Sequence, residues 1–192
     1  MRVRSLVFAL PLFLGACGYN TIQSMDERAA AAQKQISVQL QRRADLVPNL
    51  VQTVKGYAAQ EAEVFETVAK ARAGLAGAVQ GGNVTEMANA NQGLTGALGR
   101  LLAISENYPT LKSDQSFLRL QDELTGTENR IAVSRTDYNG AVQEYNAYIR
   151  TFPQVMTAKV IGSKPRDYFD VTNPGAREAP TVDFSKTAPK PR

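Results

Sequence analysis

The sequence has no histidine, no tryptophan and only one cysteine among its 192 residues. Histidine is the commonest general base and the commonest metal ligand in proteins, so its absence removes the usual means of acid–base catalysis and metal binding. A single thiol forms no disulfide within the chain, and cysteine-nucleophile and zinc sites are excluded as well. An enzyme would have to use carboxylate, lysine or tyrosine chemistry, and we expect no cofactor and no metal.

Hydrophobic runs are also short. The run over residues 6–14 has about half of the roughly 20 apolar residues that cross a bilayer as a helix, so we do not expect a permanent membrane span there. Arg2 and Arg4 precede this run, and the small residues Gly15 and Ala16 follow it. A basic start, a short apolar stretch and small residues at a junction are typical of an export signal. We therefore predict that residues 1–16 form a cleaved signal peptide.

The only cysteine lies at the predicted junction. The stretch Leu14-Gly15-Ala16-Cys17 resembles the lipobox of bacterial lipoproteins. This resemblance implies that Cys17 receives a diacylglyceryl thioether and becomes the first residue of a lipidated linker over residues 17–23. Two or more acyl chains would hold the protein firmly on a membrane. The alternative is an ordinary signal peptide, or a short anchor, with an incidental cysteine.

The residue after the cysteine is Gly18 and not an aspartate. By resemblance to the sorting rules of two-membrane bacteria, this favours an outer-membrane lipoprotein that faces the periplasm. In a host with one membrane, the anchor would place the chain on the extracytoplasmic face of the cell membrane. Loss of Arg2 and Arg4 with the leader would lower the net charge from +4 to +2. That balance is too even to indicate binding to nucleic acid.

Helical periodicity dominates the rest of the chain and predicts an all-α fold. From residue 24 to about residue 75, seam residues recur at alternate steps of three and four, which is typical of a helix packed along its length against other helices. We predict one long first helix here. Its seam positions are Met25, Ala29, Ala32, Ile36, Leu40, Arg43, Val47, Leu50, Val54, Tyr57, Glu61, Val64, Val68, Ala71 and Leu75.

Pro48 lies within this first element, where it removes a backbone hydrogen bond and crowds the preceding turn. We expect a kink over residues 44–48, because the register of the seam continues across the proline. Alternatively, Asp45 caps a new helix that has Pro48 in its first turn. We also expect the Asn49 side chain to satisfy the carbonyl that the proline leaves free.

Two further helices complete a predicted elongated antiparallel bundle over residues 24–161. The second is short, from Asn83 to about residue 107. The third is long and starts at Ser113 or Asp114. It has an apolar residue at every seventh position, namely Phe117, Leu124, Ile131, Tyr138, Tyr145 and Phe152. Over residues 162–192 the periodicity ends and prolines are frequent, so we predict an irregular, largely disordered tail with short apolar segments that could dock on the bundle.

The predicted helices differ greatly in length, at roughly 80, 35 and 55 Å for a rise of about 1.5 Å per residue. Rods of such unequal length do not cover one another if short loops make them antiparallel neighbours. Part of the first helix near the membrane would then lack a partner, and either the tail or other copies of the chain would cover it. We favour self-association, because a long apolar stripe does not stay exposed to water.

Two stretches of the chain resemble a known family. Residues 38–51, VQLQRRADLVPNLV, continuing to residues 55–58, KGYA, resemble the signature of the LemA family. Residues 123–132, ELTGTENRIA, followed by Asp137-Tyr138-Asn139 and Tyr145-Asn146, resemble its second hallmark, and the similarity covers about residues 19–170. The resemblance implies an elongated antiparallel helical bundle held at a membrane by its N-terminus, without an established enzymatic activity. Some members take part in forming magnetosome membranes, and many keep a spanning helix where this chain has a lipobox.

The polar residues of the first helix are the candidate interaction sites. Arg43 and Glu61 take up seam positions, so each needs a partner if it is buried. They lie roughly 27 Å apart along a straight helix and cannot pair with each other within it. We expect partners on the third helix, among Asp122, Glu123, Glu128 and Arg130, or on a second chain. We interpret the whole set as residues that specify helix register more than residues that bind a ligand: Arg42, Arg43, Asp45, Pro48, Asn49 and Glu61.

These observations favour a lipid-anchored, non-enzymatic helical scaffold of the cell envelope that self-associates and organises or shapes a membrane. The alternative is an envelope adaptor that presents its helical surface to another membrane or periplasmic protein. An enzyme would need several polar groups that converge in a pocket, and the sequence shows helical seams instead. The expected partners are a membrane, other copies of the chain and an envelope protein, but not nucleic acid.

Overall fold

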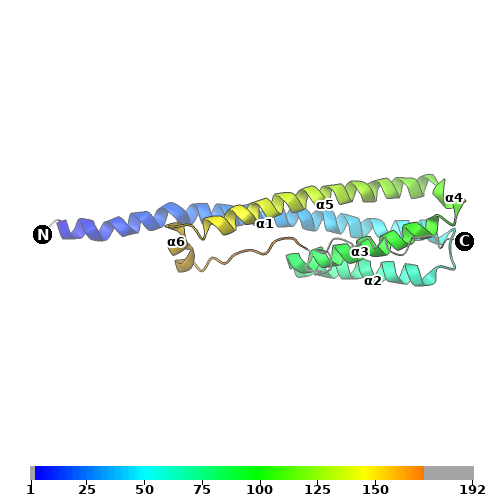
Figure 1. Ribbon diagram of the computed structural model, residues 1–192, viewed down its shortest axis with the longest axis horizontal. Helices are drawn as coiled ribbons and strands as arrows, with labels where there is room; N and C mark the ends of the chain where they lie inside the picture. Colours follow the sequence, from blue (N-terminus) through cyan, green and yellow to red (C-terminus); the bar gives the residue numbers. More distant parts are fainter. Residues whose placement is uncertain (1–2, 171–192) are drawn as a thin grey trace, which may run out of the picture.

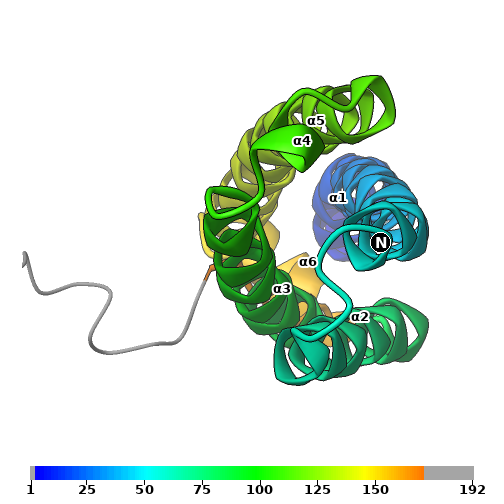
Figure 2. The same ribbon diagram turned by 90° about the vertical axis from the view of Figure 1, so that its right-hand side faces the viewer.

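The computed structural model describes residues 3–170, with side chains from residue 18 onward. This part of the chain contains six helices and no strand, which confirms the predicted all-α fold. Figure 1 shows a long rod in which α1 and α5 run antiparallel, and Figure 2 shows α5, α3 and α2 arranged around α1. The helices are α1 (Val3–Lys55), α2 (Ala62–Gly81), α3 (Val84–Ser105), α4 (Pro109–Lys112), α5 (Gln115–Tyr148) and α6 (Gln154–Val160).

The first helix differs from its prediction at both ends but not at Pro48. Residues 17–23, which were predicted as a linker, are helical within α1. α1 continues through Pro48 to Lys55 as one helix, as the unbroken register of the seam predicted. The alternative of a new helix that starts at Asp45 is therefore wrong. The helix also ends about 20 residues earlier than the seam predicted.

A turn over residues 56–61 separates α1 from α2, so the predicted single long helix is an antiparallel pair of helices. Gly56 is a poor helix former. Hydrogen bonds from Tyr57 N–H to the Val54 carbonyl and from Glu61 N–H to the Ala58 carbonyl, at 3.0 and 3.1 Å, close the turn. The seam was extended wrongly because this turn preserves the seven-residue register. Periodicity alone does not distinguish a continuous helix from two helices joined in that way.

The α2–α3 hairpin covers the half of the rod farther from the N-terminus, which we call the distal half (Figure 1). Gly82 ends α2 with φ at 71°, in the left-handed conformation that glycine adopts without strain. Asn83 then caps α3 by accepting a hydrogen bond from Glu86 N–H at 3.1 Å. Asp114 caps α5 in the same manner. These caps are the polar signals that the sequence analysis had placed at the starts of the second and third helices.

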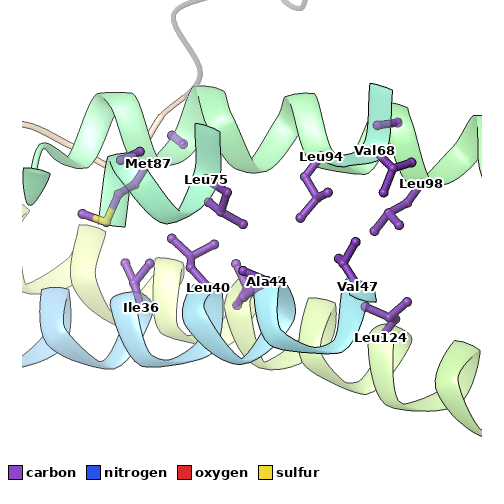
Figure 3. Packing of buried hydrophobic residues seen from close by; sticks show 14 of the residues in the cluster. Ile36, Leu40, Ala44, Val47, Val68, Leu75, Met87, Leu94, Leu98 and Leu124 are labelled. Carbon is purple, nitrogen blue, oxygen red and sulfur yellow. The ribbon is translucent and has the colours of Figure 1, made fainter. Parts of the chain in front are cut away.

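The core extends along the rod between α1 and its neighbours. In Figure 3, Ile36 and Leu40 of α1 face Leu75 and Met87 of the hairpin. Burial of a side chain of this size stabilises the fold by about 1.5–3 kcal/mol. The heptad of α5 is buried over five positions, which are Phe117, Leu124, Ile131, Tyr138 and Tyr145. Phe152, the sixth predicted position, lies beyond the end of α5 and is 76% exposed.

The half of the rod nearer the N-terminus, which we call the proximal half, has a different cover. The α2–α3 hairpin does not reach it, and α6 with residues 163–170 takes its place (Figure 1). Ile22 packs there with Tyr145, Ile149 and Ala158, and Phe169 joins the main core. The tail therefore folds back over α1, so the uncovered seam from which we predicted self-association is covered within one chain. Residues 171–192, which hold the rest of the predicted disordered tail, lie outside the described residues.

Candidate functional site

A buried arginine links three helices in the distal half of the rod. Arg43 of α1 is 2% exposed, although its neighbours along the seam are apolar. Its Nη2 donates to Glu128 Oε1 of α5 at 2.7 Å, and its Nη1 donates to Asn91 Oδ1 of α3 at 2.6 Å. The predicted pairing of Arg43 with an acidic residue of the third helix is thus present, at Glu128. A guanidinium held in this way connects α1, α3 and α5 in one register.

Burial and charge act in opposite directions on Arg43. Burial lowers the pKa of its guanidinium, and the carboxylate of Glu128 raises the pKa by a smaller amount. Arginine keeps its proton in proteins, so the pair is ionised. The Nε atom of Arg43 is buried and has no hydrogen-bond partner among the residues that the structure describes. Removal of one partner from such a pair is costly, because the other charge stays buried.

Pro48 creates a second polar contact on the same helix. A proline has no N–H, so the carbonyl of Ala44, four residues earlier, has no partner within α1. Arg72 of α2 donates to this carbonyl from Nε at 2.9 Å. The predicted partner, Asn49, is exposed and does not supply this bond. The carbonyl that Pro48 leaves free therefore links α1 to α2 through Arg72, and the helix is not broken.

The other predicted residues lie apart from these contacts. Arg42, Asp45 and Asn49 are exposed on the surface of α1. Asp45 accepts a hydrogen bond from Gln41 Nε2 at 2.8 Å, one turn earlier on the same helix. Glu61 lies at the start of α2, where its Oε1 accepts a long hydrogen bond of 3.5 Å from the Tyr108 hydroxyl. Of the six predicted residues, only Arg43 and Pro48 contribute to the links between helices at the centre of the distal half.

The proximal half holds a polar site that the sequence analysis missed. Asn146 of α5 accepts a hydrogen bond from Arg166 N–H and donates one to the Arg166 carbonyl, both at 2.9 Å. Asn139 makes the same pair of hydrogen bonds with Phe169, at 2.9 and 3.3 Å. Each amide thus binds the backbone of one residue in the extended segment 163–170. We call Asn139 and Asn146 the asparagine pair.

Two more contacts fix this segment to the bundle. The Tyr138 hydroxyl donates to the Asp167 carbonyl at 2.7 Å, and burial raises the pKa of this phenol. The Arg166 guanidinium donates from Nε and Nη2 to the two carboxylate oxygens of Asp26, at 2.7 and 3.0 Å. The hydrogen bond with Asp26 raises the pKa of Arg166 above its ordinary value. The segment is therefore held by four side chains of α1 and α5.

The one available sequence signal for this site is a spacing of seven residues. Tyr138 and Tyr145 occupy the heptad of α5, and an asparagine follows each of them directly. Both asparagines fall in the second stretch that resembles a known family. That stretch indicates the family but does not by itself indicate a role for the two asparagines.

The sequence profile described as "LemA family" matches residues 32–184, which include Arg43, Pro48 and the asparagine pair. The chain belongs to the LemA family. Among curated proteins it is similar to Magnetosome protein MamQ 1 and Magnetosome protein MamQ 2 of Paramagnetospirillum magneticum, at 33% identity. It is 31% identical to Magnetosome protein MamQ of Magnetospirillum gryphiswaldense. Each match covers 79% of this chain but 64% of the relative, so the chain spans less than two thirds of the length of these relatives.

The surface of this LemA-family chain has a shallow groove between α3 and α5. Its volume is about 420 Å³, and Leu98, Leu102, Asp122 and Arg43 are among its lining residues. Within residues 3–170, no helix has a stretch long and apolar enough to span a membrane. In the same part of the chain, no three acidic or thiol side chains converge in a way that would hold a metal ion.

Proposed function

We propose that this LemA-family protein is a lipid-anchored, non-enzymatic helical scaffold of the cell envelope. The observation that carries the proposal is the continuity of α1, which runs without a break from the lipobox at Cys17 to the distal tip at Lys55. A helix of this length extends about 60 Å from the anchor. An acyl group on Cys17 would therefore fix one end of a long rod to a membrane and allow the other end to reach up to about 60 Å from it.

The polar contacts support a structural role. The buried guanidinium of Arg43 binds Glu128 and Asn91 on other helices, and Arg72 binds the carbonyl that Pro48 leaves free. These groups hold helices in register, where a catalytic site would direct several polar groups toward a substrate. The magnetosome relatives support an association with membranes, which we extend to this chain as part of the proposal.

We place the anchored rod on the periplasmic side of a membrane, and Gly18 after the cysteine favours the outer membrane. Mass spectrometry of the full-length chain purified from bacterial membranes tests the anchor. The expected N-terminus is an acylated Cys17. Cys17→Ser should abolish acylation and membrane retention once an uncut leader has been ruled out by mass, whereas the nearby control Ser24→Ala should change neither. An unmodified Cys17 in a membrane-bound chain would overturn the proposal.

We further propose that the anchored rods associate laterally through the outer face of α1 and α5. Val38 and Val133 are 58% and 62% exposed on these two helices. Both lie within four residues of the hydrogen bond from Arg130 Nε to Gln39 Oε1, at 3.1 Å, which joins α1 and α5. Exposed apolar residues on two neighbouring helices, each close in sequence to the same contact between those helices, favour contact with another protein surface.

Cysteine crosslinking in membranes tests this face. Since the native thiol carries the acyl group, Val133→Cys introduces the only free thiol, and a face shared by two copies should give a disulfide-linked dimer. The matched control is Gln80→Cys, on an exposed position of α2. Equal crosslinking by both variants, or none by either, would contradict lateral assembly through this face.

The groove between α3 and α5 favours a second candidate function, an adaptor for another envelope protein. Its apolar residues Leu98 and Leu102 lie beside the acidic Asp122. This combination suits an amphipathic segment that carries basic residues. Crosslinking in cells from Gly99, which is exposed in the groove, would then capture one dominant foreign protein instead of other copies of the chain.

A further inference from the structure

The short helix α6 exposes apolar side chains at the proximal end of the rod. Met156 and Val160 are 61% and 87% exposed, and Phe152, just before the helix, is 76% exposed. Met156 and Val160 lie one helical turn apart, so they share a face. Ala158 lies on the opposite face and is buried. We call Phe152, Met156 and Val160 the α6 ridge.

Basic residues lie close to the α6 ridge in the sequence. Residues 149–164 contain three cations, Arg150, Lys159 and Lys164, and no acidic residue. All three cations are exposed. None of them is in a salt bridge with another residue of the described part, whereas Arg166, just beyond, is bound to Asp26. Apolar side chains among unpaired cations are typical of surfaces that bind anionic lipid headgroups.

The helix α6 lies beside the start of the mature chain, next to the proposed anchor at Cys17. A Cβ atom built on Gly18 would lie 3.5 Å from Gln154 Cγ and 3.8 Å from Thr157 Oγ1, so α6 packs against the residue that follows Cys17. Ile22, one turn farther along α1, packs in the same cluster as Ala158 of α6. Figure 1 shows that only the first turns of α1 extend beyond α6 at this end of the rod. These turns belong to the predicted signal peptide.

We propose that the α6 ridge is a second membrane contact, which inserts into the lipid surface beside the acylated Cys17. This inference rests on the proposed anchor. The three side chains offer only a fraction of the roughly 800 Å² per partner that a stable protein interface needs. A lipid contact beside an anchor needs little affinity of its own, because the anchor holds the ridge at a high effective concentration near the membrane.

The orientation of the ridge has a consequence for the whole rod. Met156 and Val160 lie on the face of α6 opposite Ala158, which packs with Ile22 of α1. The ridge therefore points away from α1, to one side of the rod. Lipid contact through it inclines the rod toward that side, where the acyl chains alone would leave the inclination free.

A fluorescent label on the ridge tests the proposal in the full-length chain. The variant Met156→Cys is labelled with a polarity-sensitive thiol probe and reconstituted in vesicles of phosphatidylcholine with phosphatidylglycerol. The matched control, Leu118→Cys, has its label on an apolar residue of α5 that is 45% exposed near the distal tip. The expected result is a blue shift and an intensity gain at position 156 and none at position 118. Adding Lys159→Glu and Lys164→Glu should reduce this response.

Each of the other outcomes contradicts the α6 contact, the anchor or both. An acylated chain whose label at position 156 stays in water overturns the α6 contact and leaves the anchor intact. Equal responses at positions 156 and 118 indicate general adsorption, and a response that rises with protein density indicates cover by a second copy. Both results also overturn the lipid contact. An unmodified Cys17, seen as a second labelled thiol, overturns the anchor, and the absence of a vesicle response from that chain overturns both.

Discussion

The helices α1 and α5 run through both halves of the rod, and each half covers them in a different way. In the distal half, the α2–α3 hairpin covers α1 and α5 with apolar side chains such as Leu75 and Met87. In the proximal half, an extended segment does so with Phe169 and is held by hydrogen bonds between its backbone and the side chains of Asn139 and Asn146. The distal cover should therefore unfold together with the core, whereas the proximal cover should open locally at a lower free energy.

The largest effect is expected from Glu128→Ala in the distal half. This change leaves the side chain of Arg43, which is 3% exposed, without its counter-ion. The free energy of unfolding should fall by about 3 kcal/mol, the lower end for a broken buried pair, because Glu128 itself is half exposed. Arg43→Met should cost less, since it removes the buried charge. Denaturation of the full-length chain in detergent measures both, and a greater loss for Arg43→Met would contradict this account.

Asn146→Ala should have a smaller and local effect in the proximal half. It leaves the N–H and carbonyl of Arg166 without their partner, at a cost of about 1–3 kcal/mol. Hydrogen exchange should become faster at residues 166–169 and stay unchanged in α2 and α3. The control is Asn49→Ala, because Asn49 is exposed on α1. Faster exchange throughout the rod would show that the two covers unfold as one unit.

Arg72→Met tests the link between Pro48 and α2. Loss of the hydrogen bond to the Ala44 carbonyl should lower stability by about 1 kcal/mol. In a Pro48→Ala background the cost should be close to zero, because that substitution restores a backbone N–H for the same carbonyl. Denaturation of the two single variants and the double variant measures the coupling. If Arg72→Met lowers stability equally in both backgrounds, the contribution of the Arg72 hydrogen bond does not depend on Pro48.

The smallest effect is expected for the dependence of stability on pH through Asp114, which caps α5. Hydrogen bonds from Phe117 N–H and from the Tyr57 hydroxyl hold the pKa of the Asp114 carboxyl below its usual range. Because the pKa is lower in the folded state, the ionised cap stabilises the fold above the pKa of the unfolded chain, and this contribution is lost as the pH falls through the folded value. The stability gap between the native chain and Asp114→Ala should thus narrow below about pH 4. Thermal unfolding in a pH series measures the gap, and a constant gap would exclude an ionised cap.

Apolar periodicity and helix-capping residues predict most of the distal half from the sequence. The seam from Ile36 to Val54 and the heptad from Phe117 to Ile131 are buried as their spacing predicts. The cap at Asn83 was also readable, because a side chain that accepts from a nearby N–H acts within one turn. These features depend on local geometry or on a repeat, and both are visible in a single sequence.

The features that were missed depend on contacts between distant segments. The partner of the free Ala44 carbonyl is Arg72, on a helix that was expected to continue the first one. Since the turn over residues 56–61 keeps the heptad register, its presence was hidden, and so was the approach of Arg72. The asparagine pair binds backbone atoms, which leave no pattern in the side chains of the bound segment.

The asparagine pair shows that the spacing of residues along a helix can match the spacing of residues along an extended chain. Asn139 and Asn146 are seven helical residues apart, about 10.5 Å, and they bind Phe169 and Arg166, which are three extended residues apart, about 10 Å. A helix with asparagine at every seventh position can therefore hold an extended chain that runs antiparallel to it, whatever side chains that chain carries. The rule provides a way to lay an extended peptide along a designed helix with no sheet present.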